Sequence, residues 1–170
     1  MKKYFYLAVL LLTATLSLTS CGDDEPKVTD TATATYTLSF SKDLLDACNV
    51  FVTYKAENGR NVMEAISNVW WSKTVTSDKF PAEFGVMYQF STKSDAELTK
   101  EKYDLTCEFG FSSKTSRGAI YSNSVTIINA SGVARDKVVS TLNKLSGKST
   151  GFRVTKDGVY SMANNLNYDD

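Results

Sequence analysis

The chain has 170 residues, and its 19 lysine and arginine residues balance 19 aspartate and glutamate residues. It contains no histidine, which excludes the commonest general base, the commonest metal ligand and every nucleophile that a histidine activates. Basic residues form no cluster, so we expect no nucleic-acid partner, since phosphate binding needs concentrated positive charge. No metal-binding or phosphate-binding motif is present, so we expect no cofactor.

The N-terminus has the organisation of a secretory signal peptide. Lys2 and Lys3 give it a basic start, and an apolar run follows over residues 4–12. This run is too short to span a bilayer as a helix, and its basic residues precede it. We therefore predict that residues 1–20 are a signal peptide that is removed.

A short motif around the predicted cleavage site indicates lipidation. The four residues in question are Leu18-Thr19-Ser20-Cys21, which resemble a bacterial lipobox. The resemblance implies cleavage before Cys21 and diacylglycerol on its thiol, with two or three acyl chains such as palmitate holding the protein stably on a membrane. The alternative is an ordinary signal peptide in which Cys21 becomes a core cysteine.

An acidic stretch follows the cysteine directly. Its residues are Gly22, Asp23, Asp24 and Glu25. They resemble the export signal of surface-exposed outer-membrane lipoproteins of the Bacteroidetes, which implies an outer-membrane location, facing the cell exterior. A merely solvated linker is the alternative, and in that case the protein could face the periplasm.

Residues 21–35 are predicted to form the lipidated N-terminus and a flexible tether, because this segment is polar and has no apolar run. Within it, Asp30-Thr31-Ala32 resembles an O-glycosylation sequon of the same bacteria. Thr31 is therefore a possible glycosylation site, with an unmodified linker threonine as the alternative. We expect one folded domain over residues 36–170.

Apolar and polar residues alternate through most of this domain, as is typical of strands with one buried face. The alternation predicts strands at 36–40, 48–54, 62–70, 84–90, 105–111, 121–127, 152–154 and 159–162. Asn58-Gly59 and Asp157-Gly158 predict hairpin turns, because these residues tolerate positive φ. One segment has helical spacing instead, and we predict a helix over Val133–Ser146, with Ser131 as N-cap and Gly147 as its stop.

Short alternating strands separated by turns predict an all-β fold, an antiparallel β-sandwich that is Ig-like in the broad sense. Cys48, Trp70 and Cys107 come in the order of an immunoglobulin signature, but the tryptophan lies too far beyond the first cysteine. We therefore predict the architecture without the family. A small barrel is the alternative.

Cys48 and Cys107 remain after lipidation, and each occupies the apolar side of its strand. In an exported protein such a pair is a candidate disulfide. Two buried, unpaired thiols are the alternative, because sequence does not show whether the two side chains meet.

The adjacent pair Trp70-Trp71 is the most suggestive local feature. Neighbouring residues of a strand point to opposite faces, so one indole is expected in the core and the other outside it. An exposed indole can stack on sugar rings or fill a partner's pocket, and Tyr88, Tyr121 and Tyr54 could widen such a platform. The alternative is an indole covered by a loop or by the helix.

The function predicted from these features is a lipid-anchored, non-catalytic binding module for a glycan or a protein partner. One alternative is a structural component of the envelope that pairs through a strand edge. A weaker alternative is a glycan hydrolase using two carboxylates, although the spacing of the strand-borne acids selects no pair. These acids are Glu64, Glu83, Asp104 and Glu108.

Overall fold

The computed structural model describes residues 29–94 and 97–169. In chain order the elements are β1 (Ala32–Phe40), α2 (Lys42–Ala47), β2 (Cys48–Lys55), the 3₁₀ turn η1 (Glu57–Gly59), β3 (Asn61–Ile66), β4 (Trp70–Ser77), β5 (Ala82–Thr92), β6 (Lys102–Thr115), β7 (Ile120–Ala134), α3 (Arg135–Asn143), β8 (Lys148–Val154) and β9 (Tyr160–Met162). Strands dominate the fold, as the alternation predicted.

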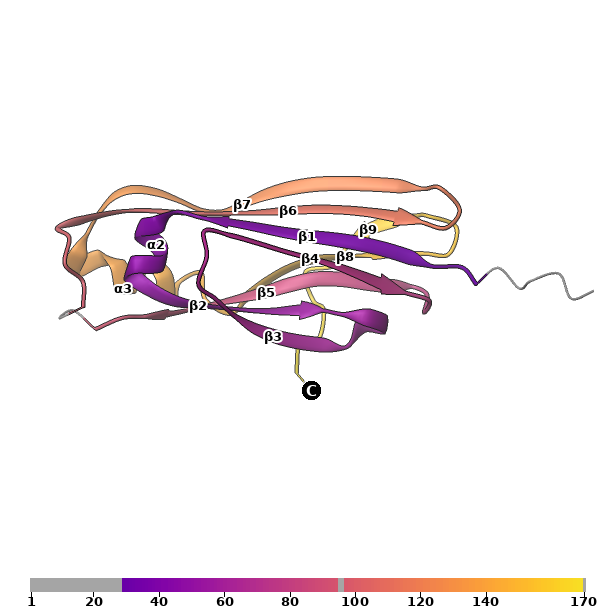
Figure 1. Cartoon of the computed structure of the whole chain (residues 1–170), viewed down its shortest axis with the longest axis horizontal. Coiled ribbons are helices and arrows are strands. Elements are labelled where there is room, and N and C mark those ends of the chain that lie inside the picture. The colour runs from indigo at the N-terminus through magenta and orange to yellow at the C-terminus, as the bar shows by residue number, and fades with distance from the viewer. Residues whose placement is uncertain (1–28, 95–96, 170) are drawn as a thin grey trace, which may run out of the picture.

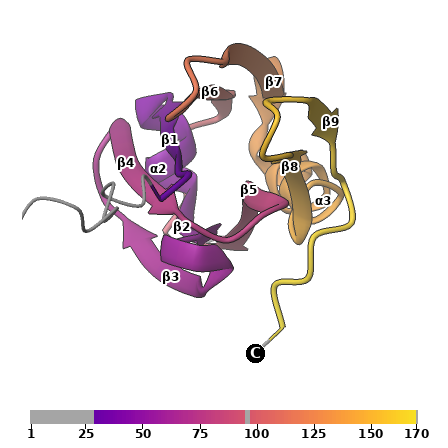
Figure 2. The ribbon, with the colours of Figure 1, turned by 90° about the vertical axis from the view of Figure 1, so that its right-hand side faces the viewer.

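The strands form two antiparallel sheets packed face to face (Figure 1). One sheet has four strands in the order β4-β1-β6-β7, and the other has five in the order β3-β2-β5-β8-β9. The predicted β-sandwich is therefore confirmed, and the two separate ladders exclude the barrel alternative. The view along the strands shows α3 on the side where the four-stranded sheet ends in β7 and the five-stranded sheet ends in β8 and β9 (Figure 2).

The core lies between the sheets and is built by the period-two pattern. In β1 buried positions alternate with half-buried ones along its full length. Tyr36, at its centre, is fully buried; its hydroxyl donates to the Lys55 carbonyl at 2.8 Å and accepts from the Gly85 N–H at 3.2 Å. Both hydrogen bonds reach the opposite sheet, so one residue satisfies polar groups within the core.

The first strand begins at Ala32, four residues before the predicted domain start at Tyr36. Ala32 and Ala34 are fully buried and continue the alternation of the strand. Small side chains and threonines make this stretch resemble a linker in composition, but its backbone pairs with β4 and β6. The predicted tether over residues 21–35 thus extended too far into the domain.

Asp30 fixes the point at which the chain enters the domain. Its carboxylate lies 2.9 Å from Arg117 Nε and 2.8 Å from Lys156 Nζ. Hydrogen bonds from Arg117 and then Lys156 lower the pKa of Asp30 to about 2. The N-terminal arm is thereby joined to the β6–β7 and β8–β9 turns, at the end of the sandwich opposite α2 and α3 (Figure 1).

Both predicted hairpin turns are present. Asn58 and Gly59 have φ of 57° and 82° between β2 and β3, and Gly158 has φ of 81° between β8 and β9. The predicted strand over residues 62–70 was wrong in one respect, because it is broken after Ile66. There the chain leaves the five-stranded sheet and enters the four-stranded sheet as β4.

The predicted helix is present as α3, but it starts later than expected. Its N-cap is Ala134, without a side-chain cap, and Ser131 lies within β7. Pairing with β6 continues to Ala134, so the ladder overrides the capping preference of Ser131. Gly147, with φ of 78°, ends the turn that follows the helix.

The short helix α2 was not predicted from the sequence. Ser41 caps it, since its hydroxyl accepts a hydrogen bond from the Leu44 N–H at 3.2 Å. The same hydroxyl donates to the Asp104 carbonyl at 2.7 Å and so attaches the helix to β6. A serine followed by a short apolar helix turn was the available signal.

Candidate functional site

The two adjacent tryptophans point to opposite faces of β4, as predicted. Trp70 is 59% exposed on the outer face of the four-stranded sheet, whereas Trp71 is 8% exposed and points between the sheets. The structure therefore assigns a core role to Trp71 and leaves Trp70 available to a ligand.

Trp71 belongs to a polar cluster around Glu64 that closes one side of the sandwich. Its indole Nε1 donates to Glu64 Oε2 at 3.1 Å, while Lys73 Nζ lies 2.8 Å from Oε1 and the Tyr54 hydroxyl donates to Oε1 at 3.0 Å. Burial alone would raise the pKa of Glu64, but these three donors lower it below its ordinary value. The rings of Tyr54 and Trp71 meet edge to face at 5.4 Å. Tyr54 and Trp71 are therefore structural here and not part of a binding platform.

The outer face around Trp70 is rich in hydroxyl groups. The strand registers place its residues in rows that run across the four strands. One row contains Trp70, Ser39, Glu108 and Thr126, the next contains Ser72, Thr37, Gly110 and Ser124, and the third contains Thr74, Thr35, Ser112 and Ser122. With neighbouring strands about 4.8 Å apart, these rows present a flat lattice of donors and acceptors.

A hollow of about 130 Å³ lies beside the indole of Trp70. Gly110 forms part of its floor, and a Cβ there would lie only 2.4 Å from Thr37 Oγ1. Ser39 and Ser124 contribute hydroxyls to the lining, and Glu108 contributes a carboxylate. Among the described residues Glu108 makes no hydrogen bond or ion pair, so its oxygens are open to a ligand.

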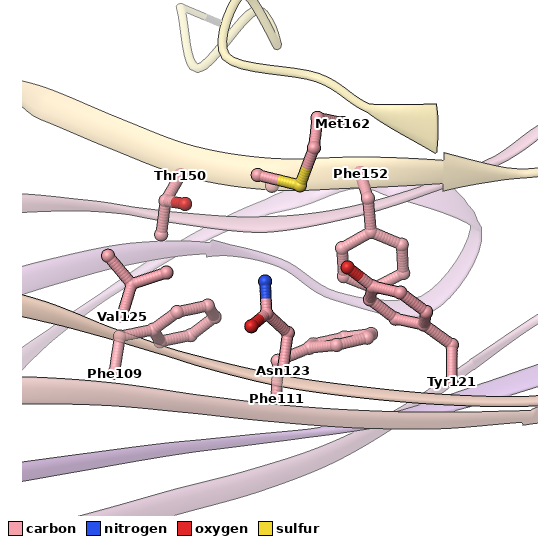
Figure 3. A pocket seen from close by; sticks show the side chains of 9 residues that line it. Phe109, Phe111, Tyr121, Asn123, Val125, Thr150, Phe152 and Met162 are labelled. Carbon is pink, nitrogen blue, oxygen red and sulfur yellow. The ribbon is translucent and has the colours of Figure 1, made fainter. Parts of the chain in front are cut away.

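The predicted tyrosine contacts lie elsewhere. Tyr121 lines an inner hollow between β7 and β8 (Figure 3), and Tyr88 lines an outer hollow that adjoins it. The two hollows share Val125, Thr150 and Met162. The structure thus brings Tyr88 and Tyr121 to one cleft but separates them from both tryptophans.

The two cysteines of the domain are free thiols. Cys48 and Cys107 are both buried, and the Cys48 thiol donates to the Leu44 carbonyl at 3.2 Å. Burial raises the pKa of each thiol to about 12. Of the two alternatives, the structure shows buried, unpaired thiols.

The strand-borne acids stand in separate environments. Glu83 pairs with Arg153 at 2.8 Å, and Asp104 accepts a hydrogen bond from the Gly132 N–H at 2.7 Å. Glu108 lines the hollow beside the exposed ring of Trp70. Within residues 29–94 and 97–169, no group of three or more acidic or cysteine side chains is arranged to hold a metal ion.

The predicted lipidation and export residues, Cys21 to Glu25, lie outside the described residues. Thr31 lies within them, and its backbone is fixed by two hydrogen bonds with Ser116, one through the Thr31 carbonyl at 2.8 Å and one through its N–H at 3.1 Å. In the part of the chain that the structure describes, neither length nor hydropathy gives any helix the means to cross a membrane.

Trp70 was predicted from the sequence as a candidate contact, but its neighbours in the hollow were not. Ser39, Gly110 and Ser124 come from three other strand positions, and nothing local marks them as partners of an indole. Glu108 was one of four strand-borne acids that their spacing did not distinguish. A pairing register for β1, β4, β6 and β7 would have been needed to place them together.

Comparison with known proteins gives no family for this chain: no protein-family model matches it, and no curated protein is similar to it in sequence.

Proposed function

We propose that this chain is a lipid-anchored, non-catalytic binding module whose ligand is a glycan. The observation that carries the proposal is the exposed indole of Trp70 beside a hollow lined by hydroxyls and one unpaired carboxylate. The proposed location is the outer face of the four-stranded sheet. An anchor on Cys21 would hold this domain at the outer membrane.

The residues around the hollow match the two chemical properties of a sugar. Its C–H face can stack on the indole of Trp70, which offers a large flat area at small entropic cost. Its hydroxyls can donate to the carboxylate of Glu108, in hydrogen bonds that are stronger because the acceptor is charged. The Ser39 and Ser124 hydroxyls can donate or accept, so they suit a ligand that itself does both.

The test is a titration of tryptophan fluorescence with a panel of soluble glycans, using the chain from Gly22 to Asp170. A saturable shift is expected for at least one glycan, and Trp70→Ala should abolish it. Thr76→Ala, on the same face but outside the hollow, is the matched control and should bind as the wild type does. If no glycan causes a shift, or if Trp70→Ala still binds with unchanged affinity, the sugar site is refuted.

The edge strand β7 supports a second candidate function, the assembly of envelope components by strand pairing. β7 has fifteen residues without a charged residue or proline, whereas the edge strands β3 and β4 carry Glu64 and Lys73, and β9 has only three residues. Long uncharged edges usually pair with another strand unless they are protected. The ring of Tyr121 stacks on that of Tyr160 at 4.9 Å, but no strand in the described part of the chain pairs with the free edge of β7.

Sedimentation of the same chain over a range of concentrations tests this second candidate. Pairing through β7 should give a dimer that Thr126→Lys weakens, because the two lysines would lie close together in the paired edges. Thr35→Lys, on the central strand β1 of the same sheet, is the control and should not affect assembly. If the chain is a monomer at every concentration, it does not assemble through β7. If Thr126→Lys and Thr35→Lys weaken the dimer equally, the contact is through the sheet face instead.

A further inference from the structure

The cleft between β7 and β8 is a second site, distinct from the hollow beside Trp70. β7 ends one sheet and β8 lies in the other, so no ladder closes this side of the sandwich. The inner hollow has an aromatic lining that includes Phe109, Phe111 and Phe152, and the outer hollow offers about 520 Å³ of space. That volume is typical of a small-molecule site.

Asn123 is a polar residue on the inward face of β7, where it pairs across the ladder with Phe111. Its Oδ1 accepts a hydrogen bond from the Ser124 N–H at 2.8 Å, but its amide nitrogen has no acceptor among the described residues. Figure 3 shows this nitrogen pointing into the space beneath Met162. Asn123 is exposed at the edge of the inner hollow, so its amide nitrogen can donate to a ligand oxygen in place of water.

The charged residues that line the cleft favour a ligand with a negatively charged oxygen. Lys148 lines the outer hollow, and neither hollow is lined by an acidic residue. In the described part of the chain Lys148 forms no ion pair. A cation and an amide donor beside an aromatic wall complement an anion that carries an apolar group.

We propose that this cleft binds a small amphipathic carboxylic acid. The carboxylate would lie between Asn123 and Lys148, and the apolar chain would lie against Phe111 and Phe152. The inner hollow leaves only about 10 Å³ free, about the space of one water molecule, so the chain enters when the Met162 side chain turns away. Met162 is unbranched and 55% exposed, which allows that movement.

Octanoate is the probe, with octylamine and 1-octanol as ligands of equal chain length and different head group. Binding is followed by the ¹³C-methyl NMR signal of Met162, assigned with Met162→Leu, on the chain from Gly22 to Asp170. Octanoate should shift this signal saturably, 1-octanol should bind more weakly, and octylamine should not bind.

Two substitutions locate the head group. Lys148→Gln should weaken octanoate about fivefold through loss of an exposed ion pair. Asn123→Ala should weaken it about tenfold through loss of a hydrogen bond to a charged group. Lys144→Gln, at the end of α3 and lining neither hollow, is the matched control and should have no effect. Trp70→Ala should also leave octanoate binding intact, which separates this site from the proposed glycan site.

The proposal fails if octanoate causes no shift up to its solubility limit. It also fails if octylamine binds as well as octanoate, or if Lys148→Gln and Lys144→Gln have equal effects. If no glycan binds but octanoate does, the proposed glycan site is refuted and the proposal for this cleft stands.

Discussion

Trp71 of β4 donates its indole N–H to Glu64 of β3 over 3.1 Å, and so joins the edges of two different sheets by a side-chain hydrogen bond. On the opposite side the Tyr160 hydroxyl of β9 accepts from Ser113 at 3.1 Å and donates to the Ala119 carbonyl at 3.4 Å, and a cleft remains between β7 and β8. Both sides are therefore joined by side-chain hydrogen bonds, but only the second also offers a cleft among the described residues.

The two tryptophans should separate stability from binding. Trp71→Ala is expected to lower the free energy of unfolding by about 3–5 kcal/mol, because it removes a large buried ring. Trp70→Ala should change that free energy by about 0.5 kcal/mol or less, since its ring is largely exposed. Urea denaturation of both variants measures the difference. Equal losses would mean that Trp70 also packs within the fold.

Glu64 should make the free energy of unfolding depend on pH in the acidic range. Its folded pKa lies below its ordinary value of 4.5, so its contribution is present above that pH and is lost as the pH falls through the folded pKa. The difference in stability between the wild type and Glu64→Gln should thus shrink on acidification. Unfolding measured from pH 7 to pH 3 checks this. Glu57→Gln, an exposed acid of the η1 turn, is the control, and a parallel response of both variants would contradict the prediction.

The thiols of Cys48 and Cys107 should be unreactive in the folded chain. Both are buried and have a pKa of about 12, so little thiolate is present at pH 8. In the chain from Gly22 onward, a thiol reagent should label neither cysteine until denaturant is added, and then both. If unfolded protein reacts only after reduction, the two cysteines form a disulfide in the isolated protein.

Gly85→Ala should destabilise the fold where the C-terminal segment crosses the five-stranded sheet. An added Cβ would lie 2.7 Å from the Thr150 carbonyl and 2.6 Å from the Tyr168 hydroxyl, and the first of these is backbone that cannot move aside easily. We expect a loss of about 1–3 kcal/mol. Tyr168→Phe is the companion variant, and it should cost little because its buried hydroxyl has no partner. If Gly85→Ala leaves the free energy of unfolding unchanged, Thr150 and Tyr168 do not pack against Gly85 as closely as the structure shows.

Features that depend only on neighbouring residues were predicted correctly from the sequence. Alternation along β1 follows from the pleat, the Asn58-Gly59 turn follows from tolerance of positive φ, and opposite orientations of Trp70 and Trp71 follow from their adjacency. These properties are local, so they could be predicted without knowledge of strand pairing.

Which of the two indoles is buried could not be predicted in this way, because it depends on Glu64 approaching from another sheet. The same holds for the hollow beside Trp70, which exists because the register places Gly110 two strands away from it. Ser131 likewise does not cap α3, because the pairing of β7 with β6 continues to Ala134. In each case the outcome depends on contacts between residues that are far apart in the sequence, and the periodicity of the sequence does not indicate such contacts.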